Sequence, residues 1–284
     1  MTITRSLLLW GSHNAWLEGQ MKRRAFARRA VRRFLPGEDV GSALTAAEDF
    51  SRRGVGSVLT QLGENLASEH DADLVRDHYF GVLEQIGQRK LPALISVKPT
   101  QLGIDFDVNG CLGRVAALVE RAGDRRVWID MEDSSYVDRT LDLFRQLRAT
   151  YENIGVCLQA YLRRTAADLE TLLPLNPAIR LVKGAYAEPP ERAFAAKRDT
   201  DANFRALGAR LIDHAATGAV MESAYATRPG CATAPRTSTY RRGRPSVREN
   251  TVTVSPSMSA MSLPGAPAPL GVRVTGIISC VESG

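Results

Sequence analysis

Residues 154–160 read Ile-Gly-Val-Cys-Leu-Gln-Ala, a short apolar run that ends on an amide side chain. A second run, Ile179-Arg180-Leu181-Val182, follows after one amphipathic stretch of helical periodicity. Runs rich in Val, Ile and Leu without polar alternation are typical of parallel strands that are covered on both faces. The two runs and the stretch between them therefore predict one strand-helix-strand unit of an α/β fold.

The same alternation extends outward from this unit, from Gly54 to residue 226. The predicted strands are Val55 to Leu62, Ala93 to Val97, Val127 to Met131, Ile154 to Ala160, Ile179 to Val182 and Ala219 to Ala226. The predicted helices between them begin near Ala72, Val108, Val137, Ala166 and Glu191. Five repeats of strand and helix followed by a sixth strand are compatible with a (βα)8 barrel, and spacing alone leaves an open doubly wound sheet as the alternative.

Both ends of the chain differ from this repeat. Amphipathic helices are predicted at residues 20–34 and 42–53, separated by Pro36-Gly37. Residues 228–284 contain no Phe or Trp and only two Leu. Because such a segment can bury little apolar surface, we expect a disordered tail. The predicted organisation is N-terminal helices over residues 1–53, a partial barrel over 54–227 and an aberrant tail over 228–284.

Charge and composition exclude several classes of protein. The 284 residues carry a net charge of +6, and the tail supplies most of it because it contains seven Arg and only two Glu. A basic excess without a helical stripe does not favour nucleic-acid binding. The four Cys and four His form no metal-ligand motif, so we expect a reducing, cytoplasmic location and no metal site. The sequence also lacks G-x-G-x-x-G, a P-loop and an apolar run long enough to span a membrane.

Polar side chains follow the predicted strands where their carboxyl ends would meet. In a parallel barrel, the residues at and beyond these ends gather at one mouth. Two cations, Lys98 and Arg180, and two acids, Glu64 and Asp130, would face one cavity there. Such a set suits a small zwitterionic or carboxylate ligand, and a cation beside a cofactor stabilises added negative charge. A structural ion pair between Glu64 and Lys98 is the alternative for those two residues.

With these residues the sequence resembles the proline dehydrogenase family. The matching segments occur in order and at the family's spacing over about residues 30–227. They are Arg32-Arg33-Phe34-Leu35-Pro36-Gly37-Glu38, Leu62-Gly63-Glu64-Asn65, Ser96-Val97-Lys98-Pro99-Thr100-Gln101-Leu102-Gly103, Ile129-Asp130-Met131-Glu132-Asp133, Gln159-Ala160-Tyr161-Leu162-Arg163-Arg164 and Arg180-Leu181-Val182-Lys183-Gly184-Ala185-Tyr186. The last two segments are the most specific to the family.

The resemblance implies a fold, a cofactor and a reaction. It implies a distorted (βα)8 barrel that holds FAD and oxidises L-proline to Δ1-pyrroline-5-carboxylate. A hydride would leave the carbon next to the proline nitrogen for flavin N5, and the electrons would then pass to a membrane quinone. Because the quinone lies in the membrane, the resemblance also allows peripheral contact with its inner face.

The resemblance also implies roles for particular residues. Lys98 would pair with the proline carboxylate, Asp130 would lie at the active site and Tyr186 would line the proline pocket. The implied cofactor-binding residues are Asp130, Gln159 at the isoalloxazine edge, Arg180 beside flavin N5, Lys183, Gly184 and Ala185. Glu64 would belong to a polar network at the barrel mouth.

The sequence departs from the family after about residue 227. The family continues with an Ala-Thr-His-Asp-Pro-like segment, two further strands and a final helix that grips the substrate carboxylate. Here Ala226-Thr227-Arg228-Pro229 stands at that point, and the tail is consistent with translation in a shifted reading frame. We therefore expect a barrel of about six strands with open edges, reduced stability and weak or absent proline oxidation.

Three other functions remain open from the sequence. A remnant could hold flavin without chemistry, and a barrel aldolase could use Lys183 as a Schiff-base nucleophile. A basic interaction protein would instead depend on the tail.

Overall fold

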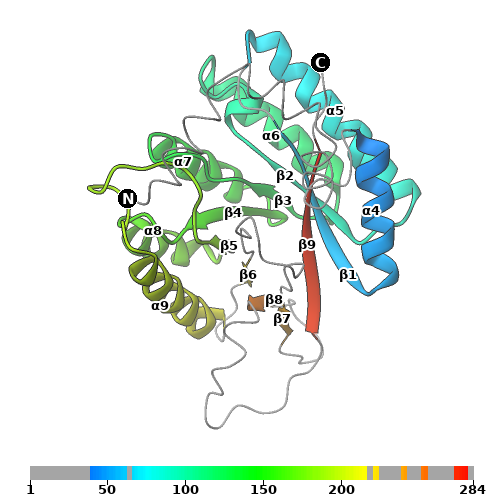
Figure 1. The fold of residues 1–284 in the computed structure, drawn as a ribbon. Helices are drawn as coiled ribbons and strands as arrows, with labels where there is room; N and C mark the ends of the chain where they lie inside the picture. Colours follow the sequence, from blue (N-terminus) through cyan, green and yellow to red (C-terminus); the bar gives the residue numbers. More distant parts are fainter. Residues whose placement is uncertain are drawn as a thin grey trace, which may run out of the picture.

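The computed structural model describes residues 39–62 and 66–215, together with the backbone of four strands further along the chain. The N-terminal helix predicted at residues 20–34 lies outside these residues, and so does Glu64. The second predicted helix is confirmed as α4 (Val40–Arg52), whose first turn is capped by the side chain of Asp39. Figure 1 shows the sheet at the centre with helices along its outside.

Parallel strands form the centre of the fold in the order of the sequence. They are β1 (Val55–Gln61), β2 (Ala93–Val97), β3 (Val127–Ile129), β4 (Ile154–Gln159), β5 (Ala178–Val182) and β6 (Val220–Ser223). Each pairs in parallel with the next. The prediction of an α/β barrel is therefore confirmed, and β1 to β5 form a curled parallel half-barrel (Figure 1).

Helices cover the outer face of this sheet. They are α5 (Glu69–Gln88), α6 (Val108–Ala122), α7 (Val137–Arg148), α8 (Thr165–Leu172) and α9 (Lys197–Ala215), with short 3-10 turns η1 (Thr100–Leu102) and η2 (Leu173–Leu175). Helix α5 begins three residues before the predicted Ala72, because Ser68 and Asp71 form a reciprocal capping box.

The start of α9 differs most from the prediction. The helix begins at Lys197 instead of near Glu191. The intervening residues pair with the chain after β4: Arg163 N donates to Arg192 O at 2.9 Å and Phe194 N donates to Tyr161 O at 2.8 Å. These residues therefore have backbone partners outside a helix, and Pro189-Pro190 just before them disfavours one.

The sheet does not end at its sixth strand. Three segments of the predicted tail are described as strands: β7 (Ser238–Arg241), β8 (Thr251–Val254) and β9 (Val272–Cys280). Strand β9 pairs in parallel with the whole of β1, and the sheet closes in the order β1-β2-β3-β4-β5-β6-β8-β7-β9. Figure 1 shows β9 beside β1. The run of β-branched residues in β9 suits a strand, so closure replaces the open edge expected after β6.

Two apolar clusters lie on opposite faces of the strands. The larger cluster lies between sheet and helices, and it includes Ile179 and Leu181 of β5. The smaller one joins Val58, Trp128 and Ala178 from three different strands. Because alternate residues of a strand point to opposite faces, Ala178 and Arg180 belong to the inner face of the barrel. Trp128 lies on this face as well. Its ring packs over Gly155 of the neighbouring strand, where a Cβ would lie only 2.4 Å from the ring.

Candidate active site

A buried ion pair lies on the inner face of the half-barrel. Arg180 of β5 pairs with the carboxylate of Asp130, which directly follows β3. The hydroxyl of Ser96 in β2 donates to Asp130 Oδ1 at 2.5 Å and accepts from Arg180 Nη2 at 3.2 Å. Since β2 and β5 are separated by two strands, these contacts must cross the concave interior. The structure thus brings together two predicted site residues, Asp130 and Arg180.

The surroundings keep Arg180 charged despite its burial. Its side chain is 7% exposed. Burial alone would favour the neutral form, but the charge of Asp130 and the contact with Cys157 raise the pKa of Arg180 above its ordinary value. The guanidinium carbon also lies 5.7 Å from the centroid of the Trp128 ring, a cation–π contact. The inner face therefore holds a permanent positive charge balanced by one carboxylate.

Gln159 ends β4 beside this pair. Its Nε2 donates to the backbone oxygen of Met131 at 2.9 Å, which fixes the orientation of the amide. Its Oε1 and Nε of Arg180 are both buried, and neither atom has a hydrogen-bond partner in the part of the chain that the structure describes. A buried acceptor and a buried donor without partners are costly unless another molecule satisfies them.

The chain after β5 passes close under Tyr161. The ladder between β4 and β5 continues beyond both strands, because Tyr161 N donates to Lys183 O at 2.9 Å. Gly184 has φ of +102°, and a Cβ at this position would lie 2.0 Å from the Tyr161 ring. Both the backbone conformation and the close approach require glycine. The Lys183-Gly184 turn is therefore held against an aromatic face.

Lys183 is held by a helix rather than by the Arg180 cluster. Its Nζ contacts Asp201 Oδ1 of α9 at 2.5 Å, and Lys197 pairs with the other oxygen of the same carboxylate. Burial raises the pKa of Asp201, but the hydrogen bonds from Lys183 and Lys197 outweigh it and lower the pKa below its ordinary value. Lys183 also lies over the Phe204 ring at 5.8 Å.

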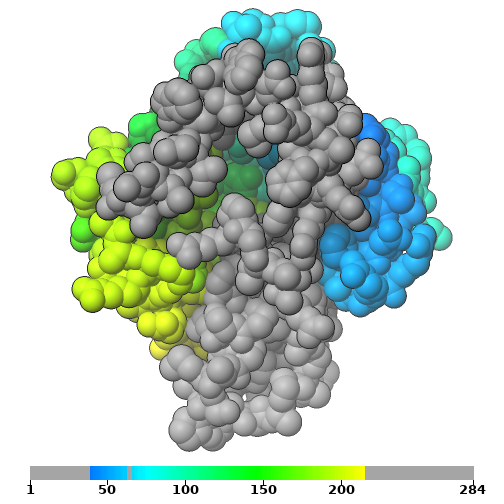
Figure 2. Space-filling view, in the orientation of Figure 1, coloured from blue at the N-terminus to red at the C-terminus, as the bar shows by residue number. Residues whose placement is uncertain are grey.

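The remaining predicted residues occupy different positions. Lys98 is half-buried and follows β2 two residues after Ser96. Ala185 is exposed, and Tyr186 is half-buried and packs against the larger apolar cluster. Figure 2 shows this view of the molecule in space-filling form, with residues from the green, middle part of the chain visible near its centre.

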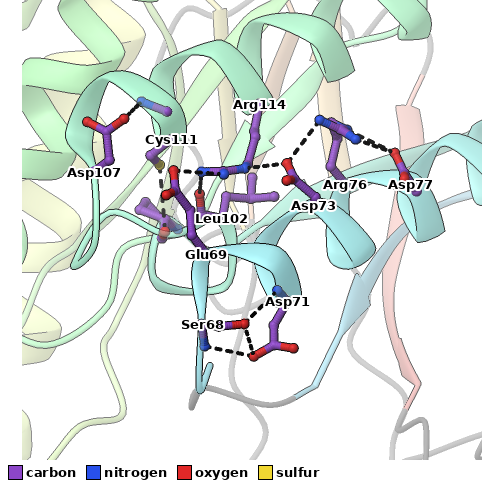
Figure 3. Close-up of polar contacts among 12 residues, drawn as sticks. Ser68, Glu69, Asp71, Asp73, Arg76, Asp77, Leu102, Asp107, Cys111 and Arg114 are labelled. Carbon is purple, nitrogen blue, oxygen red and sulfur yellow. Dashed lines mark hydrogen bonds and ion pairs between the residues drawn. The ribbon is translucent and has the colours of Figure 1, made fainter.

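The loop that carries Lys98 is anchored from outside by Arg114 of α6. Arg114 donates to the backbone oxygen of Leu102 at 3.3 Å, to Asp73 at 2.9 Å and to Glu69 at 3.1 Å (Figure 3). Glu69 and Asp73 lie in the first turns of α5. The Arg114 side chain is only 8% exposed, so this network ties the β2–α6 loop to the start of α5.

Three contributors to the site were missed by the sequence reasoning. Ser96 could have been found, because it precedes Lys98 by two residues and shares its side of the strand. Cys157 was interpreted as core, and it is buried, but it also contacts Arg180. Asp201 gave no signal, because a charged residue on a predicted surface helix is usually solvated.

The fold and the site define an α/β barrel, parallel from β1 to β6, with a buried arginine–carboxylate pair inside its half-barrel. The sequence model of the family described as proline dehydrogenase matches residues 43–239. The chain belongs to the proline dehydrogenase family.

Curated relatives agree with this membership. Proline dehydrogenase 1 of Bacillus subtilis subsp. natto is 36% identical over 182 residues, which are 63% of this chain and 60% of that protein. Proline dehydrogenase 2 of the same organism is 32% identical over 73% of this chain and 68% of that protein. The proline dehydrogenase of Deinococcus radiodurans is 36% identical over 62% of this chain and 59% of that protein.

Solved structures confirm the fold. Proline utilization A from Bdellovibrio bacteriovorus superposes with a TM-score of 0.63 over 71% of this chain and 26% of that chain, at 22% identity. The corresponding protein from Corynebacterium freiburgense gives a TM-score of 0.58 over 73% of this chain and 26% of that chain, at 21% identity.

Proposed function

We propose that the chain is a flavin-dependent proline dehydrogenase that oxidises L-proline to Δ1-pyrroline-5-carboxylate and passes the electrons to a membrane quinone. Family membership supports the reaction class. The observation that carries the proposal is the Arg180–Asp130 pair on the inner face, together with two buried polar atoms, Arg180 Nε and Gln159 Oε1, that have no hydrogen-bond partner among the described residues.

Those two atoms fit a flavin. Gln159 Oε1 offers an acceptor and Arg180 Nε offers a donor, and a flavin ring carries both N–H and C=O groups along its edges. Bound FAD would accept the two electrons that leave proline as a hydride. Lys183, Gly184 and Ala185 would contact the cofactor, with the Lys183 ammonium held in place by Asp201.

Side chains of the protein would stabilise the reduced cofactor and bind the substrate. Arg180 would stabilise the negative charge that develops on the acceptor, because its guanidinium stays protonated while buried. Asp130 and Ser96 would hold this guanidinium in one orientation. Lys98 would pair with the substrate carboxylate, and Tyr186 would line the proline pocket from the loop after β5.

A Schiff-base aldolase that uses Lys183 is less well supported. An amine nucleophile must be neutral to attack a carbonyl group. The Lys183 amine is instead engaged by the carboxylate of Asp201 at 2.5 Å, and that carboxylate is also paired with Lys197.

The prediction of weak or absent turnover concerns the chain after residue 227, whose side chains lie outside the described part. Our proposal of proline oxidation replaces that prediction, because β9 pairs with β1 where an open edge was expected. A flavin-binding remnant without chemistry is accordingly the second candidate function. Cytoplasmic location and peripheral contact with the membrane also remain proposals. Among the residues the structure describes, no helix is both long and apolar enough to cross a bilayer.

The proposal is tested by measuring proline-dependent reduction of a soluble quinone by the full chain loaded with FAD. Replacing Lys98 by Met should raise KM for proline at least about tenfold, since a charge-assisted contact to the carboxylate is lost. Lys90→Met removes an exposed lysine that precedes β2, whereas Lys98 follows that strand, and this variant should leave KM unchanged. Equal KM values for the two variants would contradict the role of Lys98.

A further inference from the structure

A second buried carboxylate lies close to the ion pair and has no role in the proposed reaction. Glu132 follows β3 by three residues and is 3% exposed. It accepts a hydrogen bond from Thr100 N at 3.0 Å and another from Thr100 Oγ1 at 2.5 Å. Both carboxylate oxygens are thus directed to one residue of the β2–α6 loop.

This arrangement is a costly way to hold a loop. Removing a carboxylate from water costs several kcal/mol unless hydrogen bonds compensate it. The neighbouring Asp133 illustrates the ordinary alternative, because it caps its own loop through Ser135 N at 2.8 Å and Ser135 Oγ at 2.5 Å. Glu132 instead reaches across to a different strand's loop.

The position of Thr100 in the chain gives this contact a consequence. Ser96 is bonded to Asp130, and Thr100 is bonded to Glu132. Lys98 lies midway in the sequence between Ser96 and Thr100. The chain around Lys98 is therefore tied on both sides to residues 130–132.

We propose that Glu132 is a positioning residue for Lys98 and, through Lys98, determines the affinity of the site for a substrate carboxylate. This inference rests on the proposed function, in which Lys98 binds that carboxylate. It adds a specificity-determining residue that itself does not touch substrate.

The fold should survive the loss of Glu132, because other contacts hold the outer side of the same loop. Arg114 Nη1 donates to Leu102 O at 3.3 Å. The Cys111 thiol lies 3.6 Å from Pro99 O. A variant at Glu132 should therefore keep the loop folded and loosen only the segment around Thr100 and Lys98.

The test compares two ligands of the same shape on the full chain loaded with FAD. Cyclopentanecarboxylate carries the negative charge and has no nitrogen to oxidise, and cyclopentanecarboxamide lacks the charge. Calorimetry should give a Kd for the carboxylate about tenfold higher in Glu132→Leu, which can make neither hydrogen bond to Thr100, with the Kd for the amide changed less than about twofold. Asp133→Asn is the matched control and should change neither Kd.

Variants at Thr100 separate positioning from general loosening. Thr100→Ser keeps the hydroxyl and should bind the carboxylate like the wild type. Thr100→Val loses the hydroxyl bond but keeps the backbone N–H bond, so it should weaken carboxylate binding by a smaller factor than Glu132→Leu. The double variant Thr100→Val with Glu132→Leu should be no weaker than Glu132→Leu alone, because that single variant already removes both hydrogen bonds.

The outcomes distinguish the two levels of the proposal. Equal weakening of both ligands, or an unchanged Kd for the carboxylate, would overturn the positioning role of Glu132 while leaving the proposed function intact. A wild-type protein that binds no carboxylate would overturn the proposed function itself, and the inference with it.

Discussion

Arg180 and Asp130 form an ion pair across the inner face of the barrel, although strand β4 lies between the strands that carry them. The contact is possible because the sheet curls, so that alternate side chains of β3 and β5 converge. Ser96 joins the pair from β2. Residues in or directly after three strands thus contribute to one polar cluster on the inner face.

Breaking this pair should destabilise the protein more than removing it entirely. Asp130→Leu leaves the buried Arg180 without its counter-charge, and we expect a loss of about 3–5 kcal/mol in the free energy of unfolding. The double variant Asp130→Leu with Arg180→Met should recover part of that loss, because no unpaired charge remains. Urea unfolding of the three proteins measures both effects. A double variant less stable than Asp130→Leu would show that the unpaired charge of Arg180 is not what destabilises Asp130→Leu.

Gly155 should tolerate no side chain. A Cβ at this position would lie 2.4 Å from the Trp128 ring, so Gly155→Ala must displace the indole and disturb the adjacent Arg180. We expect a loss of about 1–3 kcal/mol from overpacking. Gly81→Ala in α5 is the control, because a Cβ there meets nothing within 4 Å. It should gain roughly 0.5–1 kcal/mol from helix propensity. Thermal unfolding of both variants checks the difference, and equal melting temperatures would count against the packing of Trp128 on Gly155.

Asp201 should contribute stability that depends on pH. Its pKa in the folded protein lies below the ordinary value of 3.8, so the folded state binds fewer protons than the unfolded state near that pH. The contribution is therefore complete above the unfolded value and is lost as the pH falls through the lower folded value. Because the Asp201 side chain is 21% exposed, we expect roughly 1 kcal/mol at neutral pH.

The free energy of unfolding of Asp201→Asn, relative to wild type, provides the measurement. The difference should be largest above about pH 5 and should shrink as the pH approaches 3. Asp199→Asn removes an exposed carboxylate from the same helix and should change stability little. A difference for Asp201→Asn that grows on acidification would have the wrong sign for this account.

The strands could be predicted from the sequence because each is a continuous apolar run with a polar end. The predicted run Ile179 to Val182, for example, became β5 with one residue added. The helix starts were less accurate where local hydrogen bonds decide them, as at Ser68 and in the segment before Lys197. Neither the capping box nor the pairing of residues 192–194 leaves a periodic signal.

The site was predictable only in part for a related reason. Asp130, Arg180 and Gln159 could be found because they stand at strand ends or within strands of a recognisable family pattern. Asp201 belongs to a helix that is distant in sequence, and only the fold brings it to Lys183. The closing strand β9 was not predicted, because a single β-branched run inside a Ser- and Pro-rich segment has no neighbouring helix to indicate a repeat.

The central claim is that the Arg180 cluster forms a flavin site at which L-proline is oxidised. The most direct test is the visible spectrum of the full chain with FAD, recorded without oxygen before and after addition of L-proline. The account predicts a protein-bound flavin band that L-proline bleaches in the wild type and leaves unchanged in Arg180→Met. A flavin band that does not respond to proline, or a protein that retains no flavin, would contradict it.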